Sequence, residues 1–352
     1  MNFNLQNIVR KHILSLAPYS SARDEYTGKE GIFLDANENP LGSVTPENWN
    51  RYPDPYQTDV KEKIASLKEC SPSQIFLGNG SDEPIDLIIR LTCEPTVDNI
   101  IILPPTYGMY EVSANVNNVE IQKTPLTTDY QLDTEKIISS INTKTKLIFI
   151  CSPNNPTGNL IDRKAIMRVI EHFQQGIVII DEAYNDFSGE PSFIPELEKF
   201  KNVMVLQTFS KAWGLASLRL GMAFGSDELI GFLNKIKYPY NINGLTQRAL
   251  IENIGNVAFM KDSVEKLNQN REKVIFELKK MPNVLNIFPS DANFLLVKFI
   301  EAKRIFDYLI EQKVIVRDRS KVILCDDSLR ISIGTEEENH ILINLLNQYK
   351  PL

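Results

Sequence analysis

The chain has 352 residues, of which 43% are hydrophobic and 24% charged, a composition typical of a globular protein of about two domains. Its 38 basic and 45 acidic residues leave a net charge of -7, which excludes the overall positive charge of many nucleic-acid-binding proteins. The four cysteines and three histidines are scattered along the chain, so we expect neither a disulfide framework nor a bound metal.

The N-terminal sequence has no apolar core typical of a secretion signal. No apolar run approaches the roughly 18 residues that cross a membrane. We therefore expect a cytoplasmic protein that binds small molecules and neither nucleic acid nor membranes. Residues 1–45 contain several prolines and glycines, which predicts an irregular N-terminal arm whose apolar side chains need a surface to pack on.

Residues 46–240 alternate helical patterns with short apolar runs, which indicates a large α/β domain with a mostly parallel sheet. The predicted helices span 60–67, 82–93, 107–115 and 162–174. The predicted strands span 75–77, 99–103, 146–151, 176–181, 203–208 and 220–224.

Residues 241–352 have a different pattern, which predicts a smaller α+β domain. A long helical stretch covers 244–281, with a break near Gly255. The other predicted helices are 301–312 and 335–349. The predicted strands are 284–288, 293–299, 314–316, 321–324 and 329–333.

Ligands of open α/β sheets bind beyond the carboxyl ends of the strands, so the residues that follow each strand are the first candidates for a site. Strand 75–77 is followed by a glycine-rich turn and a helix that begins near Ser81 and Asp82. Free backbone N–H groups at a helix start suit a phosphate, although a simple capped turn is the alternative. The turn is not a complete dinucleotide fingerprint, because Glu83 stands where the third glycine belongs.

Two further strands end in side chains suited to a cofactor. After strand 146–151, a turn with two prolines holds Asn155 extended before Pro156, so its amide can face the site. Strand 176–181 ends at Asp181, and a carboxylate at the end of a buried strand needs a cation beside it. A protonated ring nitrogen of a cofactor would serve, and so would an ordinary arginine or lysine.

Strand 203–208 ends in Thr208, with Ser210, Lys211 and Arg219 following. A lysine at this edge can have a lowered pKa and act as an imine-forming nucleophile, whereas a solvated surface charge is the alternative. Arg219 suits a phosphate. A phosphate cup, an anion for a pyridinium, an amide and a nucleophilic lysine are together what an enzyme dependent on pyridoxal 5'-phosphate (PLP) needs.

The chain also resembles a known family. It resembles the fold-type I PLP-dependent aminotransferases, and among them the histidinol-phosphate aminotransferase family, from Pro18 to about Thr335. The general motifs are S-P-N-N-P-T-G (152–158), D-E-A-Y (181–184) and S-K-A-W-G-L-A-S-L-R-L-G (210–221). The narrower motifs are P-Y-S-S-A-R (18–23), L-D-A-N-E-N-P (34–40), R-Y-P-D-P (51–55), P-P-T-Y-G-M-Y (104–110), V-R-D (316–318) and L-R-I-S-I-G-T (329–335).

The resemblance implies that Lys211 binds PLP covalently and that Asp181 pairs with the pyridinium nitrogen. It implies that Asn155 and Tyr184 bond the phenolate oxygen and that Tyr107 stacks on the ring. The cofactor phosphate would be held by Ser81, Asp82, Thr208, Ser210, Arg219 and, from the second subunit of a homodimer with shared active sites, Tyr52.

The family transfers an amino group between L-histidinol phosphate and 2-oxoglutarate in histidine biosynthesis, giving imidazole-acetol phosphate and glutamate. By the resemblance, Lys211 moves a proton from the substrate Cα. The resemblance implies that Lys211, Asp181 and Tyr184 are the catalytic residues. The expected substrate-binding residues are Tyr19, Arg23, Asn37, Arg317 and Arg330.

Three other interpretations stay open at this point. Threonine-phosphate decarboxylases and broad aromatic aminotransferases share this cofactor and fold. The run V-I-I-D-E (178–182) also resembles a strand of ATP-hydrolysing proteins, but no G-x-x-x-x-G-K-[ST] loop accompanies it. A non-catalytic protein that kept the fold is the third alternative. The charged stretch 318–328 has no role that the sequence alone assigns.

Overall fold

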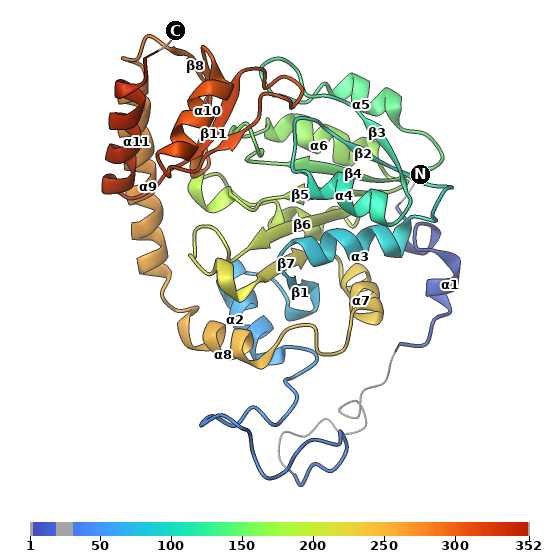
Figure 1. The fold of residues 1–352 in the computed structure, drawn as a ribbon. Coiled ribbons are helices and arrows are strands. Elements are labelled where there is room, and N and C mark those ends of the chain that lie inside the picture. The colour runs from blue at the N-terminus through green and yellow to red at the C-terminus, as the bar shows by residue number, and fades with distance from the viewer. Residues whose placement is uncertain (1–2, 19–30, 351–352) are drawn as a thin grey trace.

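The computed structural model describes residues 3–18 and 31–350, so the candidates Tyr19 and Arg23 lie outside the described residues. Two sheets organise these residues (Figure 1). The larger has seven strands in the order β1-β7-β6-β5-β4-β2-β3, and the smaller has four in the order β10-β11-β9-β8. The predicted α/β fold with a second, smaller α+β part is confirmed.

The large sheet is parallel except around one strand. Strands β2, β3, β4, β5 and β6 pair in parallel, whereas β7 is antiparallel to both of its neighbours, β6 and β1. The strands are β1 (Ile75–Asn79), β2 (Asn99–Ile102), β3 (Glu120–Lys123), β4 (Thr145–Cys151), β5 (Ile177–Asp181), β6 (Val203–Thr208) and β7 (Leu220–Phe224).

Helices cover both faces of this sheet, which explains the almost continuous apolar runs in its central strands. One face packs against helices α1 (Lys11–Leu14), α3 (Asp82–Thr92), α4 (Met109–Val116) and α7 (Asp227–Ile236). The other packs against α2 (Thr58–Lys68), α5 (Thr134–Ser140), α6 (Arg163–His172) and α8 (Gly244–Asn253).

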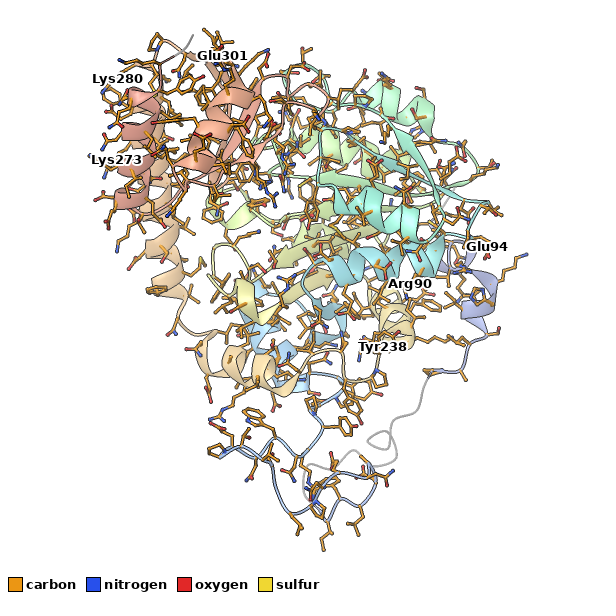
Figure 2. The ribbon with its side chains drawn as sticks, in the orientation of Figure 1. Arg90, Glu94, Tyr238, Lys273, Lys280 and Glu301 are labelled. Atoms are coloured by element: carbon orange, nitrogen blue, oxygen red, sulfur yellow. The ribbon has the colours of Figure 1, made fainter. Side chains whose placement is uncertain are left out.

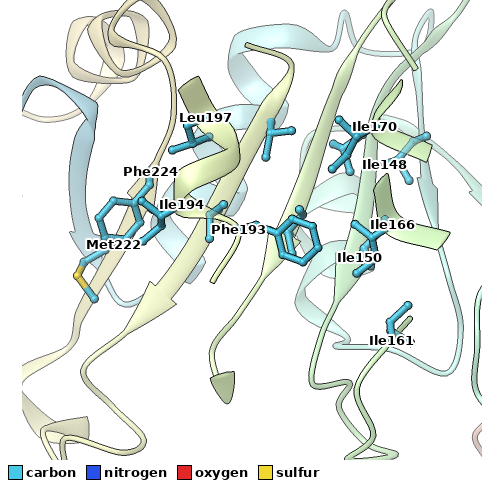
Figure 3. Packing of buried hydrophobic residues seen from close by; sticks show 14 of the residues in the cluster. Ile148, Ile150, Ile161, Ile166, Ile170, Phe193, Ile194, Leu197, Met222 and Phe224 are labelled. Carbon is cyan, nitrogen blue, oxygen red and sulfur yellow. The ribbon is translucent and has the colours of Figure 1, made fainter. Parts of the chain in front are cut away.

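Side chains of β4 alternate between the two cores, as the two-residue period of a strand requires. Ile148 and Ile150 lie on the side of α6, where they face Ile166 and Ile170 (Figure 3). Phe149 points to the opposite side, into the core that includes α3. Each of these side chains is at most 1% exposed, so the centre of the sheet is rigidly held.

The small sheet contains β8 (Val284–Ile287), β9 (Phe294–Phe299), β10 (Arg317–Asp318) and β11 (Ser328–Ser332). Helices α9 (Val257–Leu278), α10 (Ala302–Glu311) and α11 (Glu336–Gln348) pack on it. Lys273 of α9 pairs with Glu336 at the start of α11, and Figure 2 labels Lys273 beside that helix. Leu250 of α8 and Ile254 belong to the core of the large sheet, so the domain boundary near residue 240 stays a prediction.

Two predicted strands of this part are wrong. Residues 314–316 and 321–324 are loops, and only the two residues of β10 pair with β11. On this side of β11, pairing is limited to Arg317 and Asp318. Left-handed backbone at Lys313, Leu324 and Asp327 also turns the chain within this region. The sequence analysis does not predict strand β3 of the large sheet or helices α5 and α7, which pack on that sheet.

Residues 31–56 extend away from the sheets, below α2 and α8 in the view of Figure 1. Several of their apolar side chains are almost fully exposed, including Ile32, Leu34, Leu41 and Val44. In the first described segment, residues 3–18, Arg10 pairs with Glu94. Figure 2 labels Glu94 beside α1. Among the described residues, no helix is long and apolar enough to cross a membrane.

Candidate active site

The carboxyl ends of β4, β5 and β6 meet at one edge of the large sheet. Cys151 at the end of β4 pairs with Asp181 at the end of β5, and Asp181 pairs with Leu206 near the end of β6. Asn155 and Lys211 follow these strands within five residues, so the sheet brings them to this edge. Because β7 runs the opposite way, its beginning reaches the same edge, with Arg219 immediately before it.

A cavity of about 830 Å³ opens at this edge, between the large sheet and the small sheet. Six of the predicted site residues line it, and they come from segments far apart in the chain. They are Tyr107, Asn155, Tyr184, Lys211, Arg317 and Arg330.

Lys211 is in a position to act as a nucleophile. Its Nζ lies 5.6 Å from the centre of the Tyr184 ring. Partial burial of the amine lowers the pKa of Lys211, and the positive charge of Arg330 lowers it further, while Asp181 raises it. A lysine with a lowered pKa has more of the neutral amine that attacks a carbonyl carbon.

Asp181 is buried, with 2% of its surface exposed. Its Oδ2 accepts a hydrogen bond of 2.6 Å from the Tyr110 hydroxyl, and its Oδ1 accepts one of 3.1 Å from the backbone N–H of Ala183. Burial raises the pKa of Asp181, and these two donors lower it. No ion pair to Asp181 forms within 3–18 and 31–350, so this carboxylate still needs a cation.

The turn after β1 brings the candidates for the cofactor phosphate together. Ser81 precedes α3, and its hydroxyl makes no hydrogen bond to the first turn of that helix. A Cβ added to Gly80, which has a φ of +71°, would lie 2.5 Å from the Arg219 guanidinium. A Cβ on Gly221 of β7 would lie 2.2 Å from the Ser81 nitrogen. Both glycines therefore allow the close approach of backbone and guanidinium at this turn.

The Asp82 carboxylate already has two partners, Tyr107 and Arg219. It accepts a hydrogen bond of 3.0 Å from the Tyr107 hydroxyl and lies 3.8 Å from a guanidinium nitrogen of Arg219. A carboxylate does not bind phosphate, so any contact of Asp82 with a phosphate would come from its backbone N–H. Across the turn, the Thr208 hydroxyl lies 3.0 Å from that of Ser210.

A chain of hydrogen bonds connects the two sheets across the cavity. Arg330 on β11 donates a bond of 2.5 Å to the Asn155 Oδ1, and the Asn155 amide donates one of 3.4 Å to the Tyr184 hydroxyl. Arg330 also lies 5.3 Å from the centre of the Phe294 ring. Burial lowers the pKa of Arg330, but a guanidinium stays charged at neutral pH. An arginine thus faces the position that a substrate would take beside Lys211.

Two predicted residues lie away from this edge of the large sheet, in a separate hollow. Tyr52 is 53% exposed and stacks on Tyr240 at 4.5 Å. It lines a separate hollow, together with Asn37. Their predicted roles therefore require either a second subunit or a movement of the arm.

Three residues at this site had no predicted role. Tyr110 follows the stacking candidate Tyr107 by one helical turn, and only the fold reveals that it contacts Asp181. Arg319 and Lys321 line the cavity beside Arg317. The charged residues of the stretch 318–328 were the available signal, but the sequence does not show that their side chains face the cavity.

These residues fit PLP in three independent respects. The buried carboxylate of Asp181 needs a cation, which a pyridinium nitrogen would supply. The turn before α3 brings the Arg219 guanidinium beside the N-terminal backbone of that helix, which suits a phosphate. The lowered pKa of Lys211 favours the neutral amine that attacks an aldehyde. The fold and this lysine-centred site define an enzyme of the fold-type I aminotransferase class.

Comparisons with known proteins support the assignment to this class. The model of the family "Aminotransferase class I and II" matches residues 29–346, and the chain belongs to this family. A histidinol-phosphate aminotransferase of Cytophaga hutchinsonii is 54% identical over 99% of this chain and 100% of its own length.

Two solved structures have the same fold. The histidinol-phosphate aminotransferase of Clostridium acetobutylicum has a TM-score of 0.79 and 26% identity, over 85% of this chain and 90% of its own. That of Sinorhizobium meliloti, in complex with pyridoxal-5'-phosphate, has a TM-score of 0.78 over 89% of this chain and 90% of its own. The latter is 21% identical, so it supports the fold alone.

Proposed function

We propose that this protein is a PLP-dependent aminotransferase that transfers an amino group between L-histidinol phosphate and 2-oxoglutarate in histidine biosynthesis. The products are imidazole-acetol phosphate and glutamate. The observation that carries the proposal is the placement of Lys211 and Arg330 in one cavity, with Tyr184 and Asn155 between them. The name of the Cytophaga hutchinsonii relative supplies the substrate.

When bound, PLP supplies an electron sink for the electrons left on the substrate Cα. Asp181 would bind its ring nitrogen, and Tyr184 and Asn155 would bond its ring oxygen. Tyr107 would pack against the ring. The phosphate would be held by Ser81, Thr208, Ser210, Arg219 and the start of α3.

The reaction itself requires a base beside the substrate. The Nζ of Lys211, with its lowered pKa, would take the proton from the substrate Cα and return it to the adjacent carbon. Arg330 would bind the substrate anion, because a guanidinium suits both the carboxylate of glutamate and the phosphate of histidinol phosphate. Arg317 would bind the second acidic group of glutamate.

A homodimer in the cytoplasm is part of the same proposal. The exposed apolar side chains of residues 31–44 would be buried against a second copy, which would place Tyr52 at that copy's cofactor phosphate. Asn37, Tyr19 and Arg23 would act on the substrate side of a shared site. The partners are otherwise small-molecule substrates, without nucleic acid or membrane.

The proposal is tested by the absorbance of the holoenzyme during titration with histidinol phosphate in the absence of a keto acid. We expect the visible absorption of the lysine-bound cofactor to disappear and 2-oxoglutarate to restore it, because the two half-reactions use one site. Lys211→Ala, which lacks the nucleophile, should show neither change. An absorption that histidinol phosphate leaves untouched, with carbon dioxide released from threonine phosphate, would instead indicate a decarboxylase.

A further inference from the structure

The active-site cavity has more positive charge than transamination of a carboxylate substrate requires. Four cations of the small-sheet part line it: Arg317 on β10, Arg319 and Lys321 in the loop that follows, and Arg330 on β11. Its one lining carboxylate, Glu111, is paired with Lys123 at 2.7 Å.

None of these four cations forms an ion pair with a carboxylate of the described residues 3–18 and 31–350. Arg330 has a neutral partner, the amide oxygen of Asn155 at 2.5 Å. The Nε of Arg319 is buried and has no hydrogen-bond partner there. A buried guanidinium donor without an acceptor is costly, so Arg319 is the one of the four whose surroundings are incomplete.

The backbone holds Arg319 in place beside the other arginines. Arg317 on β10 pairs in register with Arg330 on β11. The N–H of Arg319 donates to the carbonyl oxygen of Ser328 at 2.9 Å, and its own carbonyl accepts from the N–H of Val322 at 2.8 Å. The position of Arg319 is therefore set by β11 and not by its own side chain.

Like charges in one cavity repel each other until an anion arrives. Burial and the charge of Arg317 lower the pKa of Arg319, and the nearby Asp318 raises it only in part. The Asp318 side chain accepts the backbone N–H of Ser320 at 2.9 Å. A phosphate monoester at neutral pH has a charge of about −1.5 to −2 and three acceptor oxygens, whereas a carboxylate has a single charge.

We propose that Arg319 is a specificity-determining residue that binds the phosphate of the substrate's phosphate ester, in addition to the arginine that both substrates share. This inference rests on the proposed function, because it assigns the phosphate-bearing substrate to this cavity. Arg319 contributes little to glutamate, whose acidic groups are satisfied by Arg330 and Arg317. The cavity therefore distinguishes its two substrates by charge and by the number of acceptor oxygens.

The test uses holoenzyme, so that the cofactor's own phosphate subsite is filled. Arg319→Gln removes the charge and keeps a polar side chain, and Arg319→Lys keeps the charge without the planar guanidinium. Arg304→Gln is the matched control, since Arg304 pairs with Glu301 on the surface of α10, outside the cavity. Binding of inorganic phosphate is measured by calorimetry, and KM and kcat are measured for histidinol phosphate and for glutamate.

We expect Arg319→Gln to weaken inorganic phosphate binding and to raise the KM of histidinol phosphate by about tenfold to a hundredfold, the size of a lost charge-assisted hydrogen bond. The KM of glutamate should change by less than about threefold, and kcat should be retained. Arg319→Lys should be intermediate, and Arg304→Gln should match the wild type in every measurement.

Two results would overturn the proposal: equal losses with both substrates, or phosphate binding that is the same in Arg319→Gln and the wild type. Wild-type holoenzyme that binds phosphate through Arg319 but does not turn over histidinol phosphate would contradict the proposed function instead. The calorimetric measurement needs no turnover, so the two failures are distinguishable.

Discussion

Asp181 shows how much of this site depends on single hydrogen bonds. Its carboxylate has lost nearly all contact with water, and Tyr110 and the Ala183 N–H are the donors that remain. Tyr110 is itself fully buried, with its ring 4.7 Å from that of Phe149. Tyr110 is therefore a positioning residue, because it acts on a cofactor only through the carboxylate that it holds.

We predict that Tyr110→Phe makes the free energy of unfolding of the cofactor-free protein more dependent on pH. Burial already raises the pKa of Asp181 above the roughly 3.9 of an unfolded aspartate, and loss of the hydroxyl raises it further. The folded state then binds more protons than the unfolded state, so stability falls as pH rises through this window. The variant should lose about 1–3 kcal/mol more than the wild type between pH 4 and pH 7 in urea unfolding.

Tyr130→Phe is the matched control for this measurement. Tyr130 is also buried, but its hydroxyl donates to the neutral carbonyl of Leu324 at 2.7 Å. Its loss should lower stability by the same amount at both pH values. A pH dependence of Tyr110→Phe no larger than that of Tyr130→Phe would show that Tyr110 does not keep Asp181 ionised.

Among the elements, β7 sets the geometry of the turn proposed to hold the cofactor phosphate. It lies between β1 and β6 and is antiparallel to both, so its first residues face the start of α3. Gly221 stands opposite Thr208 in this register and packs directly on the Ser81 backbone. A glycine inside a central strand weakens it unless another backbone comes close, which is the case here.

We predict that Gly221→Ala lowers both stability and PLP affinity. The added Cβ would meet backbone atoms of Gly80 and Ser81 at 2.2–2.3 Å, and neither can move without displacing α3 from the subsite. Overpacking of this kind costs about 1–3 kcal/mol or more. Urea unfolding and a fluorescence titration of the apoenzyme with PLP would measure the two effects.

Gly231→Ala provides the control within the same fold. Gly231 lies inside α7, and a Cβ there would have no heavy atom within 4 Å. Alanine should stabilise the helix by about 0.5–1 kcal/mol without any change in PLP affinity. If Gly221→Ala behaved like Gly231→Ala, the close approach of β7 to the phosphate turn would have no consequence.

For the molecule as a whole, the main feature is the arm of residues 31–56, which extends away from the two sheets. These residues lie apart from the Lys211 cavity, and their apolar side chains face outward. An arm that packed on its own chain would bury those side chains. The proposed homodimer gives them a surface and brings Tyr52 to the neighbouring site.

We predict that inactive variants complement each other across the dimer. If Lys211→Ala and Tyr52→Ala subunits are dissociated, mixed and reassociated, half of the dimers are mixed, and each has one site without a substitution. Activity should then rise to about a quarter of the wild-type value. Lys211→Ala mixed with Asp181→Ala is the control, because both residues belong to the site of one chain. An equal lack of recovery in both mixtures would place Tyr52 in its own chain's site.

The sequence predicted an element well where the pattern is local and poorly where the element depends on contacts with distant segments. Strands such as β5 and β6 were predicted within a residue, because an apolar run bounded by turns depends on local sequence. The predicted strands 314–316 and 321–324 were wrong: only Arg317 and Asp318 pair with β11, and left-handed backbone at Lys313 and Leu324 turns the chain there. The contact of Tyr110 with Asp181 joins residues 71 positions apart, beyond the reach of local patterns.

The residue types and their order along the chain were enough to indicate the family, the fold class and the lysine-centred chemistry, because that chemistry depends on a few side chains at the ends of strands. The tertiary structure decided which cations share the cavity and which carboxylate is buried. It also showed that Tyr52 and Asn37 line a separate hollow, away from the Lys211 cavity. The physical reason is that charge, burial and hydrogen bonding at a site depend on distances across the fold, whereas motifs record only distances along the chain.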